Sequence, residues 1–293
     1  MKKSIYLAVV ICIAAFSGCS NQPGPVSLIA PGAVVEQAAD GFTFTEGPAA
    51  DAEGNLYFTD VAAQKIYKLA VDGTLSVFME HSFGTNGLYF DAAGNLIGCV
   101  GNLGKIAVIN MDATMTDIAG EYDNIPFNSP NDLWIDPKGG IYFTDPRYGD
   151  RSNLPQAGEH VYYIAPDRKT VIRVLDKMVR PNGLIGTPDG TILYVADHGA
   201  EMTYKYSIND DGTLTHSRIF VQEGSDGVTM DELGNLYITT DAVKVYNPKG
   251  ELIDTIQTPQ QPSNITFAGP HKNILYITAR NGLYKIKMNV KGI

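Results

Sequence analysis

A short pattern of polar turn residues followed by apolar, β-forming residues occurs six times along the chain. The first copy, DAEGNLYFTD, runs from Asp51 to Asp60. The other copies are DAAGNLIGCV from Asp91, DPKGGIYFTD from Asp136, PDGTILYVAD from Pro188, DELGNLYITT from Asp231 and HKNILYITAR from His271. Their central residues are Tyr57, Ile97, Tyr142, Tyr194, Tyr237 and Tyr276, which lie 39 to 52 residues apart. Repetition at this interval indicates stacked supersecondary units.

Each unit predicts a turn followed by strands. The glycine turn reverses the chain, and the Tyr, Phe, Ile, Val and Thr residues after it favour a strand. A second run of β-forming residues follows in every unit, at residues 65–69, 105–109, 160–164, 203–206, 243–246 and 283–286. Short strands separated by Gly, Pro and Asp turns are typical of all-β proteins. We therefore predict an all-β, six-bladed β-propeller over residues 34–293, closed by pairing of residues 34–44 with residues 283–293.

The first residues predict export. Lys2 and Lys3 precede an apolar run from Ile5 to Phe16, which is short for a membrane span and typical of a signal peptide. The run ends in Phe-Ser-Gly-Cys, which resembles a bacterial lipobox. We therefore expect a lipoprotein signal peptide at 1–18, lipidation of Cys19 and a flexible tether at 19–33. The protein would then be an exported bacterial protein, lipid-anchored in the cell envelope (periplasm or outer membrane), with membrane contact only through this anchor. An ordinary secretory signal cut nearby is the alternative.

Composition narrows the classes of partner. Of the three cysteines, only Cys99 lies outside the signal and lipobox, so no internal disulfide is expected. The net charge of −10 argues against a nucleic-acid partner, because phosphate binding requires basic surfaces. An acidic chain is compatible with cation binding, although many exported proteins are acidic for solubility.

Polar residues precede the repeated phrases at a similar interval in several units. They lie in the segments TEGP (45–48), SPND (129–132), RPNG (180–183) and GSDG (224–227), with a weaker match in TNG (85–87). Equivalent positions of successive blades surround the propeller axis, so we expect the polar residues of these segments to converge. The expected set is Glu46, Asn131, Asn182 and Asp226. Two carboxylates and two amide carbonyls are the all-oxygen ligands that a hard divalent cation such as Ca²⁺ prefers. Each segment alone is also an ordinary turn signal, with Asn or Asp capping the turn.

At these residues the chain resembles the SMP-30/gluconolactonase/LRE-like family of six-bladed propeller hydrolases. The resemblance rests on FTEGP at 44–48, SPNDLWIDPKGGIYFTDPRYG at 129–149, RPNGL at 180–184 and SDGVTMDELGNLY at 225–237. It implies that Glu46, Asn182 and Asp226 ligate a metal, and that Asn131 ligates it or binds substrate beside it. The implied cofactor is one divalent cation: Ca²⁺ first, with Zn²⁺, Mg²⁺ and Mn²⁺ as alternatives.

The resemblance implies metal-dependent hydrolysis of a small-molecule lactone or ester. The cation would polarise the carbonyl, and a carboxylate would activate water. Asp226 is the first candidate for this catalytic base and Asp132 the second. Animal relatives carry an arginine where this chain has Ser129, so we consider Arg147 and Asn86 as substrate-binding residues, together with Asn131. Arg147 also has a structural alternative, as a surface arginine that bridges loops.

Two other functions stay open at this point. One is a non-catalytic surface propeller that binds peptide or glycan; polar residues at the axis count against it. The other is a phosphotriesterase or aryl esterase on the same fold, which only the shape of the pocket would distinguish. A serine hydrolase is disfavoured because no Gly-x-Ser-x-Gly segment occurs. A monomer is expected.

Overall fold

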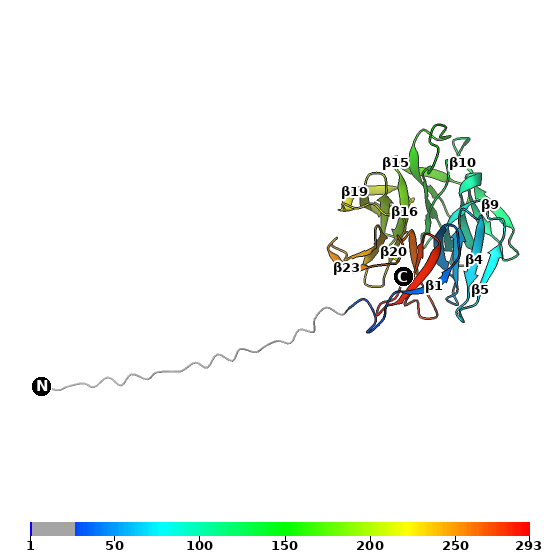
Figure 1. The fold of residues 1–293 in the computed structure, drawn as a ribbon. Helices are drawn as coiled ribbons and strands as arrows, with labels where there is room; N and C mark the ends of the chain where they lie inside the picture. The colour runs from blue at the N-terminus through cyan, green and yellow to red at the C-terminus, as the bar shows by residue number, and fades with distance from the viewer. Residues whose placement is uncertain (2–26) are drawn as a thin grey trace.

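Each copy of the repeated phrase forms the second strand of a four-stranded antiparallel sheet. The computed structural model describes Met1 and residues 27–293, which form six such sheets and one two-stranded hairpin (Figure 1). The innermost strand of each sheet contacts the innermost strand of the next, and the last contacts the first. The predicted six-bladed β-propeller is therefore confirmed. The predicted signal peptide, Cys19 and residues 20–26 lie outside the described residues.

We name the sheets blade 1 to blade 6 and give their strands from the innermost outward. Blade 1 contains β2 (Thr45–Ala50), β3 (Leu56–Asp60), β4 (Lys65–Leu69) and β5 (Leu75–Met79). Blade 2 contains β6 (Thr85–Phe90), β7 (Leu96–Val100), β8 (Lys105–Ile109) and β9 (Met115–Ala119). Blade 3 contains β12 (Leu133–Ile135), β13 (Ile141–Asp145), β14 (Glu159–Ile164) and β15 (Val171–Met178).

The second half of the chain repeats this arrangement. Blade 4 contains β16 (Pro181–Gly186), β17 (Ile192–Asp197), β18 (Met202–Ile208) and β19 (Leu214–Val221). Blade 5 contains β20 (Val228–Met230), β21 (Leu236–Thr239), β22 (Val243–Tyr246) and β23 (Leu252–Ile256). Blade 6 contains β24 (Asn264–Ala268), β25 (Ile274–Ala279), β26 (Gly282–Lys287) and β1 (Glu36–Asp40). The remaining elements are the 3-10 helix η1 (Gly101–Leu103) and the hairpin of β10 (Glu121–Tyr122) and β11 (Ile125–Pro126).

The polar start of the phrase makes the turn between the first and second strands. In blade 1, Asp51 Oδ1 accepts the backbone N–H of Asn55 at 2.8 Å, and Gly54 between them has φ of 89°. Such a φ is easily reached only by glycine. The same aspartate-to-backbone bond recurs at Asp91, Asp136 and Asp231. The repeated Asp and Gly are therefore turn residues, as the sequence predicts.

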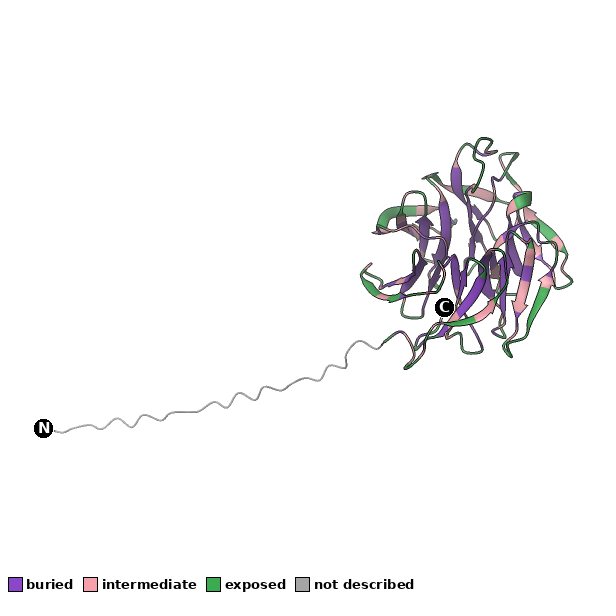
Figure 2. Cartoon of the chain, viewed as in Figure 1, coloured by how far each residue is buried: buried purple, intermediate pink, exposed green. Residues whose placement is uncertain are grey.

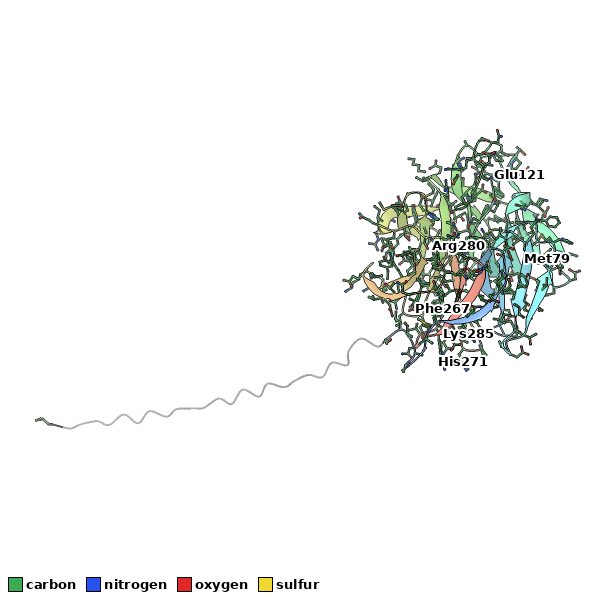
Figure 3. The ribbon with its side chains drawn as sticks, viewed as in Figure 1. Met79, Glu121, Phe267, His271, Arg280 and Lys285 are labelled. Carbon is green, nitrogen blue, oxygen red and sulfur yellow. The ribbon has the colours of Figure 1, made fainter. Side chains whose placement is uncertain are left out.

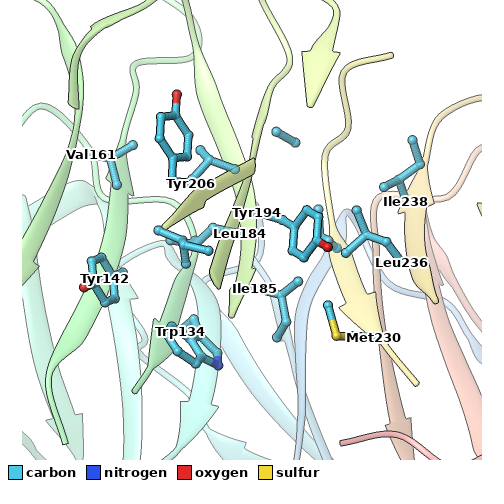
Figure 4. Packing of buried hydrophobic residues seen from close by; sticks show 14 of the residues in the cluster. Trp134, Tyr142, Val161, Leu184, Ile185, Tyr194, Tyr206, Met230, Leu236 and Ile238 are labelled. Atoms are coloured by element: carbon cyan, nitrogen blue, oxygen red, sulfur yellow. The ribbon is translucent and has the colours of Figure 1, made fainter. Parts of the chain in front are cut away.

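Burial falls from the axis outward, as Figure 2 shows. All five residues of β3 are buried, whereas the first three of β5 are exposed. The inner strands pack against the blades on both sides, which explains their nearly continuous apolar sequence. Figure 4 shows one of these inter-blade cores, where Trp134 of blade 3, Ile185 of blade 4 and Met230 of blade 5 belong to one cluster. Cys99 is buried and free.

Blade 6 joins the two ends of the chain. Strand β1 pairs with β26 in the register Gln37 to Tyr284, as expected for a closed ring. The preceding residues also pack here: Leu28 is buried in the core of this blade, and its carbonyl accepts the backbone N–H of Asn289 at 2.8 Å. Within the segment predicted as a tether at 19–33, Leu28 therefore contacts blade 6, because its apolar side chain is drawn into the blade core.

The two ends of β25 mark the two faces of the propeller. Figure 3 labels His271 just before this strand and Arg280 just after it. His271 lines a groove with residues 30–34, whereas the Arg280 guanidinium lies 5.8 Å from the ring of Phe44, beside β2. The polar residues that precede the repeated phrases lie at this second face. No helix in the described part of the chain is long and apolar enough to cross a bilayer.

Candidate metal centre

The strand register identifies one equivalent position in all six blades. In each blade, the central residue of the phrase pairs with one residue of the innermost strand. In blade order these partners are Ala49, Tyr89, Trp134, Ile185, Thr229 and Thr266. Three residues before each of these partners lie Glu46, Asn86, Asn131, Asn182, Asp226 and Ser263. Five of the six equivalent positions thus carry an oxygen-bearing Glu, Asp or Asn side chain. Ser263 is turned away, because its hydroxyl donates to the carbonyl of Thr45 at 2.7 Å.

The next position along the chain is glycine in four blades, at residues 47, 87, 183 and 227. These glycines allow neighbouring inner strands to approach closely. A Cβ on Gly47 would lie 2.0 Å from the carbonyl oxygen of Asn86, so no larger residue fits without moving the strand. Blades 3 and 6 carry Asp132 and Asn264 at this position instead. The Asn264 amide donates to Asp132 Oδ2 at 3.3 Å.

The last aspartate of the phrase holds the loops that lead to these positions. Asp60 accepts the backbone N–H groups of Thr43 and Phe44, just before Glu46. Asp145 binds the N–H groups of residues 128 and 129 in the same way, and Asp197 binds those of residues 179 and 180. Carboxylate-to-backbone bonds of this kind are stronger than neutral ones. The Asp of the phrase therefore fixes where blades 1, 3 and 4 present Glu46, Asn131 and Asn182.

Asn182 and Asp226 are joined directly. The Asn182 Nδ2 donates to Asp226 Oδ1 and to the hydroxyl of Tyr148, both at 2.6 Å. Its carbonyl oxygen Oδ1 is buried and has no hydrogen-bond donor among the described residues. Asn86 Oδ1 is likewise buried and has no hydrogen-bond donor among the described residues. Buried polar atoms are usually satisfied, so two unpartnered oxygens at equivalent positions indicate a cationic or hydrogen-bonding ligand.

Three carboxylates lie near one another in this centre. Glu46 is 3% exposed, and burial together with the nearby Asp226 and Asp132 raises its pKa well above the ordinary value. Burial raises the pKa of Asp132 to about 7. Burial also raises the pKa of Asp226 to about 6, against the opposing effects of His198 and of the amide of Asn182. Clustered carboxylates in a low-dielectric site favour either protons or a cation.

The donor set fits a hard divalent cation. The described residues contain no cluster of three or more His, Cys, Asp or Glu side chains arranged to hold a metal, so a cation here would depend partly on amide oxygens. Glu46 and Asp226 supply carboxylate oxygens, while Asn182 and Asn86 supply unpartnered amide oxygens. An all-oxygen set of this kind suits Ca²⁺ better than a thiophilic ion.

Asn131 and Arg147, two of the predicted substrate-binding residues, lie in different surroundings. Asn131 occupies the ring, and its backbone carbonyl accepts the N–H of Gly87 from blade 2 at 2.7 Å. Arg147 lies after β13, and its Nη2 donates to the carbonyl of Asn128 at 2.7 Å. The guanidinium of Arg147 thus joins two loops, which is the structural role considered as its alternative. A role in substrate binding stays a prediction for both residues.

Comparisons with known proteins identify the family of this chain. Residues 44–281 match the profile of the SMP-30/gluconolactonase/LRE-like region, which covers most of the chain. The chain belongs to this family. The gluconolactonase of Zymomonas mobilis subsp. mobilis is 27% identical over 295 aligned residues, which cover 88% of this chain and 82% of that protein. The predicted family is therefore confirmed.

Two solved structures extend the comparison. The structure of a gluconolactonase from Xanthomonas campestris superimposes with a TM-score of 0.84 and 30% identity, over 89% of this chain and 91% of that one. The calcium-binding protein regucalcin from Agrobacterium tumefaciens shares the fold, with a TM-score of 0.75 and 19% identity over 87% of this chain and 93% of that one.

In this SMP-30/gluconolactonase-like protein, sequence reasoning missed two residues of the centre. Asn264 is the residue that blade 6 contributes. It lies two residues before Thr266, the strand partner of Tyr276, so counting from the repeated phrase would have found it. Tyr148 comes from the long β13–β14 loop and contacts Asn182; no repeat positions this loop, so the sequence carried no such signal. Trp134 is 2% exposed and belongs to the apolar core between the blades.

A polar hollow adjoins the centre. It has a volume of about 260 Å³ and lies between the loops of blades 4, 5 and 6. Its lining includes His198, Gln222, Ser225, Asp226, Thr240 and Gln261. His198 also approaches the Tyr148 hydroxyl, with its Nδ1 3.4 Å away. The lining also includes Glu201 and Glu223, so hydroxyl, amide, imidazole and carboxylate groups surround the outer side of Asp226.

Proposed function

We propose that this protein is a lactonase that depends on a divalent cation, with calcium as the first candidate. The observation that carries the proposal is the ring of five oxygen-bearing side chains at equivalent blade positions, two of which present buried, unpartnered amide oxygens. Its gluconolactonase relatives support hydrolysis of a lactone. Regucalcin, which shares the fold, supports calcium.

The residues have two roles, binding the cation and activating water, and Asp226 is a candidate for both. Glu46, Asn182 and Asp226 would hold the cation, with Asn86 or Asn131 completing the set; a bound cation supplies Lewis-acid polarisation of a substrate carbonyl. Asp226 is better placed than Asp132 to take a proton from water. Both oxygens of Asp132 accept hydrogen bonds, from the N–H of Leu133 and the amide of Asn264. Asp226 uses only Oδ1, toward Asn182, so its other oxygen has no donor among the described residues.

The hollow beside Asp226 supports a polar substrate. Its lining of hydroxyl, amide, imidazole and carboxylate groups can donate and accept hydrogen bonds with the substituents of a small lactone ring. A purely hydrocarbon aryl ester would leave these groups without partners, which costs free energy. We therefore place hydroxylated lactones before aryl esters and phosphotriesters.

The test is turnover of a substrate panel by the purified protein with Ca²⁺, with Zn²⁺ or with chelator. The panel contains hydroxylated lactones, aryl esters and a phosphotriester. We expect lactone hydrolysis that chelator abolishes and Ca²⁺ restores, and a loss of at least about 100-fold in Asp226→Asn, the order found for removal of a general base. The matched control, Asp189→Asn in an exposed turn, should keep full activity. Turnover that survives chelator would contradict the proposal, and cation binding without any turnover would favour a binding propeller.

A further inference from the structure

The side-chain amide of Asn182 is held in one orientation. Both of its donor bonds are short and go to different partners, Asp226 Oδ1 and the Tyr148 hydroxyl, each 2.6 Å from Nδ2. A carboxylate oxygen only accepts hydrogen bonds, so the NH₂ end of the amide must face Asp226. The carbonyl oxygen is then directed away from both partners. Asn182 is 1% exposed, and the Tyr148 residue that covers its amide is 41% exposed.

Tyr148 is itself held from two sides. Its ring lies over the guanidinium of Arg180, 5.2 Å from the ring centre. Arg180 Nε lies 3.8 Å from the carboxylate of Glu159, whose side chain is only 1% exposed. Arg151, from the same β13–β14 loop as Tyr148, binds the other oxygen of Glu159 at 2.5 Å. A buried carboxylate thus forms ion pairs with the arginine beneath the Tyr148 ring and with an arginine of the loop that carries Tyr148.

We propose that Tyr148 is a positioning residue, whose hydroxyl locks the Asn182 amide so that its carbonyl oxygen, and not its NH₂ group, faces the cation. This inference deepens the proposed function and rests on its cation site. The backbone before Asn182 is already fixed by Asp197, so the remaining freedom of this ligand is rotation of its amide. Two donor bonds remove that freedom, and one alone leaves the amide able to turn about its bond to Asp226.

The positioning role gives a reason for the contact between Tyr148 and Asn182, which the six-fold repeat does not require. The other three ring residues that are followed by glycine, Glu46, Asn86 and Asp226, have no tyrosine hydroxyl bound to their side chains among the described residues. An asparagine offers a cation one good oxygen and one repelling NH₂ group, whereas a carboxylate offers two oxygens. An amide ligand therefore gains from a partner that fixes its orientation. Pre-organisation of this kind strengthens binding by reducing the ordering cost.

The variant that tests the inference is Tyr148→Phe, which keeps the ring over Arg180 and removes only the hydroxyl. The matched control is Tyr204→Phe in β18, on the outer part of blade 4. Calcium affinity is measured by titration calorimetry on the full chain. We expect about a fivefold loss of affinity in Tyr148→Phe, the order expected for one net hydrogen bond, and no loss in the control. Melting temperatures recorded with chelator should show that both variants fold.

A second measurement needs no cation. The side-chain NH₂ signals of Asn182, assigned by their disappearance in Asn182→Ala, are followed by NMR in the presence of chelator. We expect their exchange with solvent to be about fivefold faster in Tyr148→Phe and unchanged in Tyr204→Phe. Signals that do not change would overturn the positioning role, whatever the calcium affinity. Faster exchange in Tyr148→Phe with an unchanged calcium affinity would overturn the link between the orientation of the Asn182 amide and cation binding. If the parent protein binds no calcium, the proposed cation site fails, while the NMR result still decides whether Tyr148 locks Asn182.

Discussion

Replacing Asp197 by asparagine should weaken the fold and loosen the approach to the candidate metal centre. Asp197 is 1% exposed and accepts three backbone N–H bonds, from Val179 at 2.7 Å, from Arg180 at 2.8 Å and from Ala200 at 3.1 Å. The first two bonds hold the segment that ends in Asn182. Asparagine has nearly the same shape but only one accepting oxygen.

The size of the effect follows from those contacts. If the asparagine oxygen keeps the bonds to Arg180 and Ala200, its NH₂ group faces the N–H of Val179. One charge-assisted bond is then lost, about 1.5–3 kcal/mol, and two donors face each other, which costs about another 1 kcal/mol. Relief of the desolvated carboxylate offsets part of this cost. We expect the free energy of unfolding to fall by about 3 kcal/mol.

Urea denaturation at neutral pH measures this difference. Trp134 is the only tryptophan and is buried, so its fluorescence reports loss of the native core. Asp189→Asn is the matched control: Asp189 also accepts bonds from its turn but is exposed, and a change within about 0.5 kcal/mol is expected. If the two substitutions cost the same, the aspartate at the end of the phrase does not support the fold as argued.

His160 and Gly227 give two further predictions. His160 is buried, and burial lowers its pKa, so the unfolded chain takes up a proton as pH falls below about 6.5 while the folded chain resists. As pH falls through this range, the free energy of unfolding of the parent protein should therefore decrease by up to about 1.4 kcal/mol per pH unit more than that of His160→Gln. Equal pH profiles of the two proteins would contradict this. A Cβ on Gly227 would lie 2.2 Å from Asn264 Oδ1, so Gly227→Ala should cost about 1–3 kcal/mol. Gly120→Ala, whose nearest contact is 3.4 Å, should be nearly neutral in the same denaturation assay, and similar losses in both would refute the packing argument.

The fold could be predicted from the sequence because one local pattern repeats with its spacing nearly intact. An aspartate-glycine turn and a run of β-forming residues are each determined by neighbours in the chain, as the bond from Asn55 to Asp51 shows. Repetition then requires the units to stack. The start of the packed chain was harder, because the burial of Leu28 depends on β26, more than 250 residues away in sequence.

Only the site residues that lie on the repeated strand register could be predicted from the sequence. Glu46, Asn182 and Asp226 lie on a strand register that a reader can count from the phrase. Tyr148 lies in a loop whose path is set by Arg151 and the buried Glu159, contacts that no period encodes. Asn264 was within reach of counting, but its blade lacks the glycine that follows the ring residue in four of the other five blades, and it carries Ser263 where they have Glu, Asn or Asp.

The absence of this glycine from blades 3 and 6 has a packing reason. Blades 3 and 6 are three positions apart in a ring of six, so Asp132 and Asn264 extend toward the axis from opposite sides and meet there. Between them the other four blades carry glycine, and a Cβ on Gly87 would lie 2.5 Å from Asp132 Oδ1. A Cβ on Gly227 would likewise lie 2.2 Å from Asn264 Oδ1, so Gly87 and Gly227 make room for the Asp132–Asn264 pair. Gly47 and Gly183 have a different reason, because a Cβ there would meet the backbone carbonyl of the next inner strand, at residue 86 or 226. A longer residue at position 87 or 227 therefore requires a shorter one at 132 or 264, whereas positions 47 and 183 need glycine whichever residues form the pair.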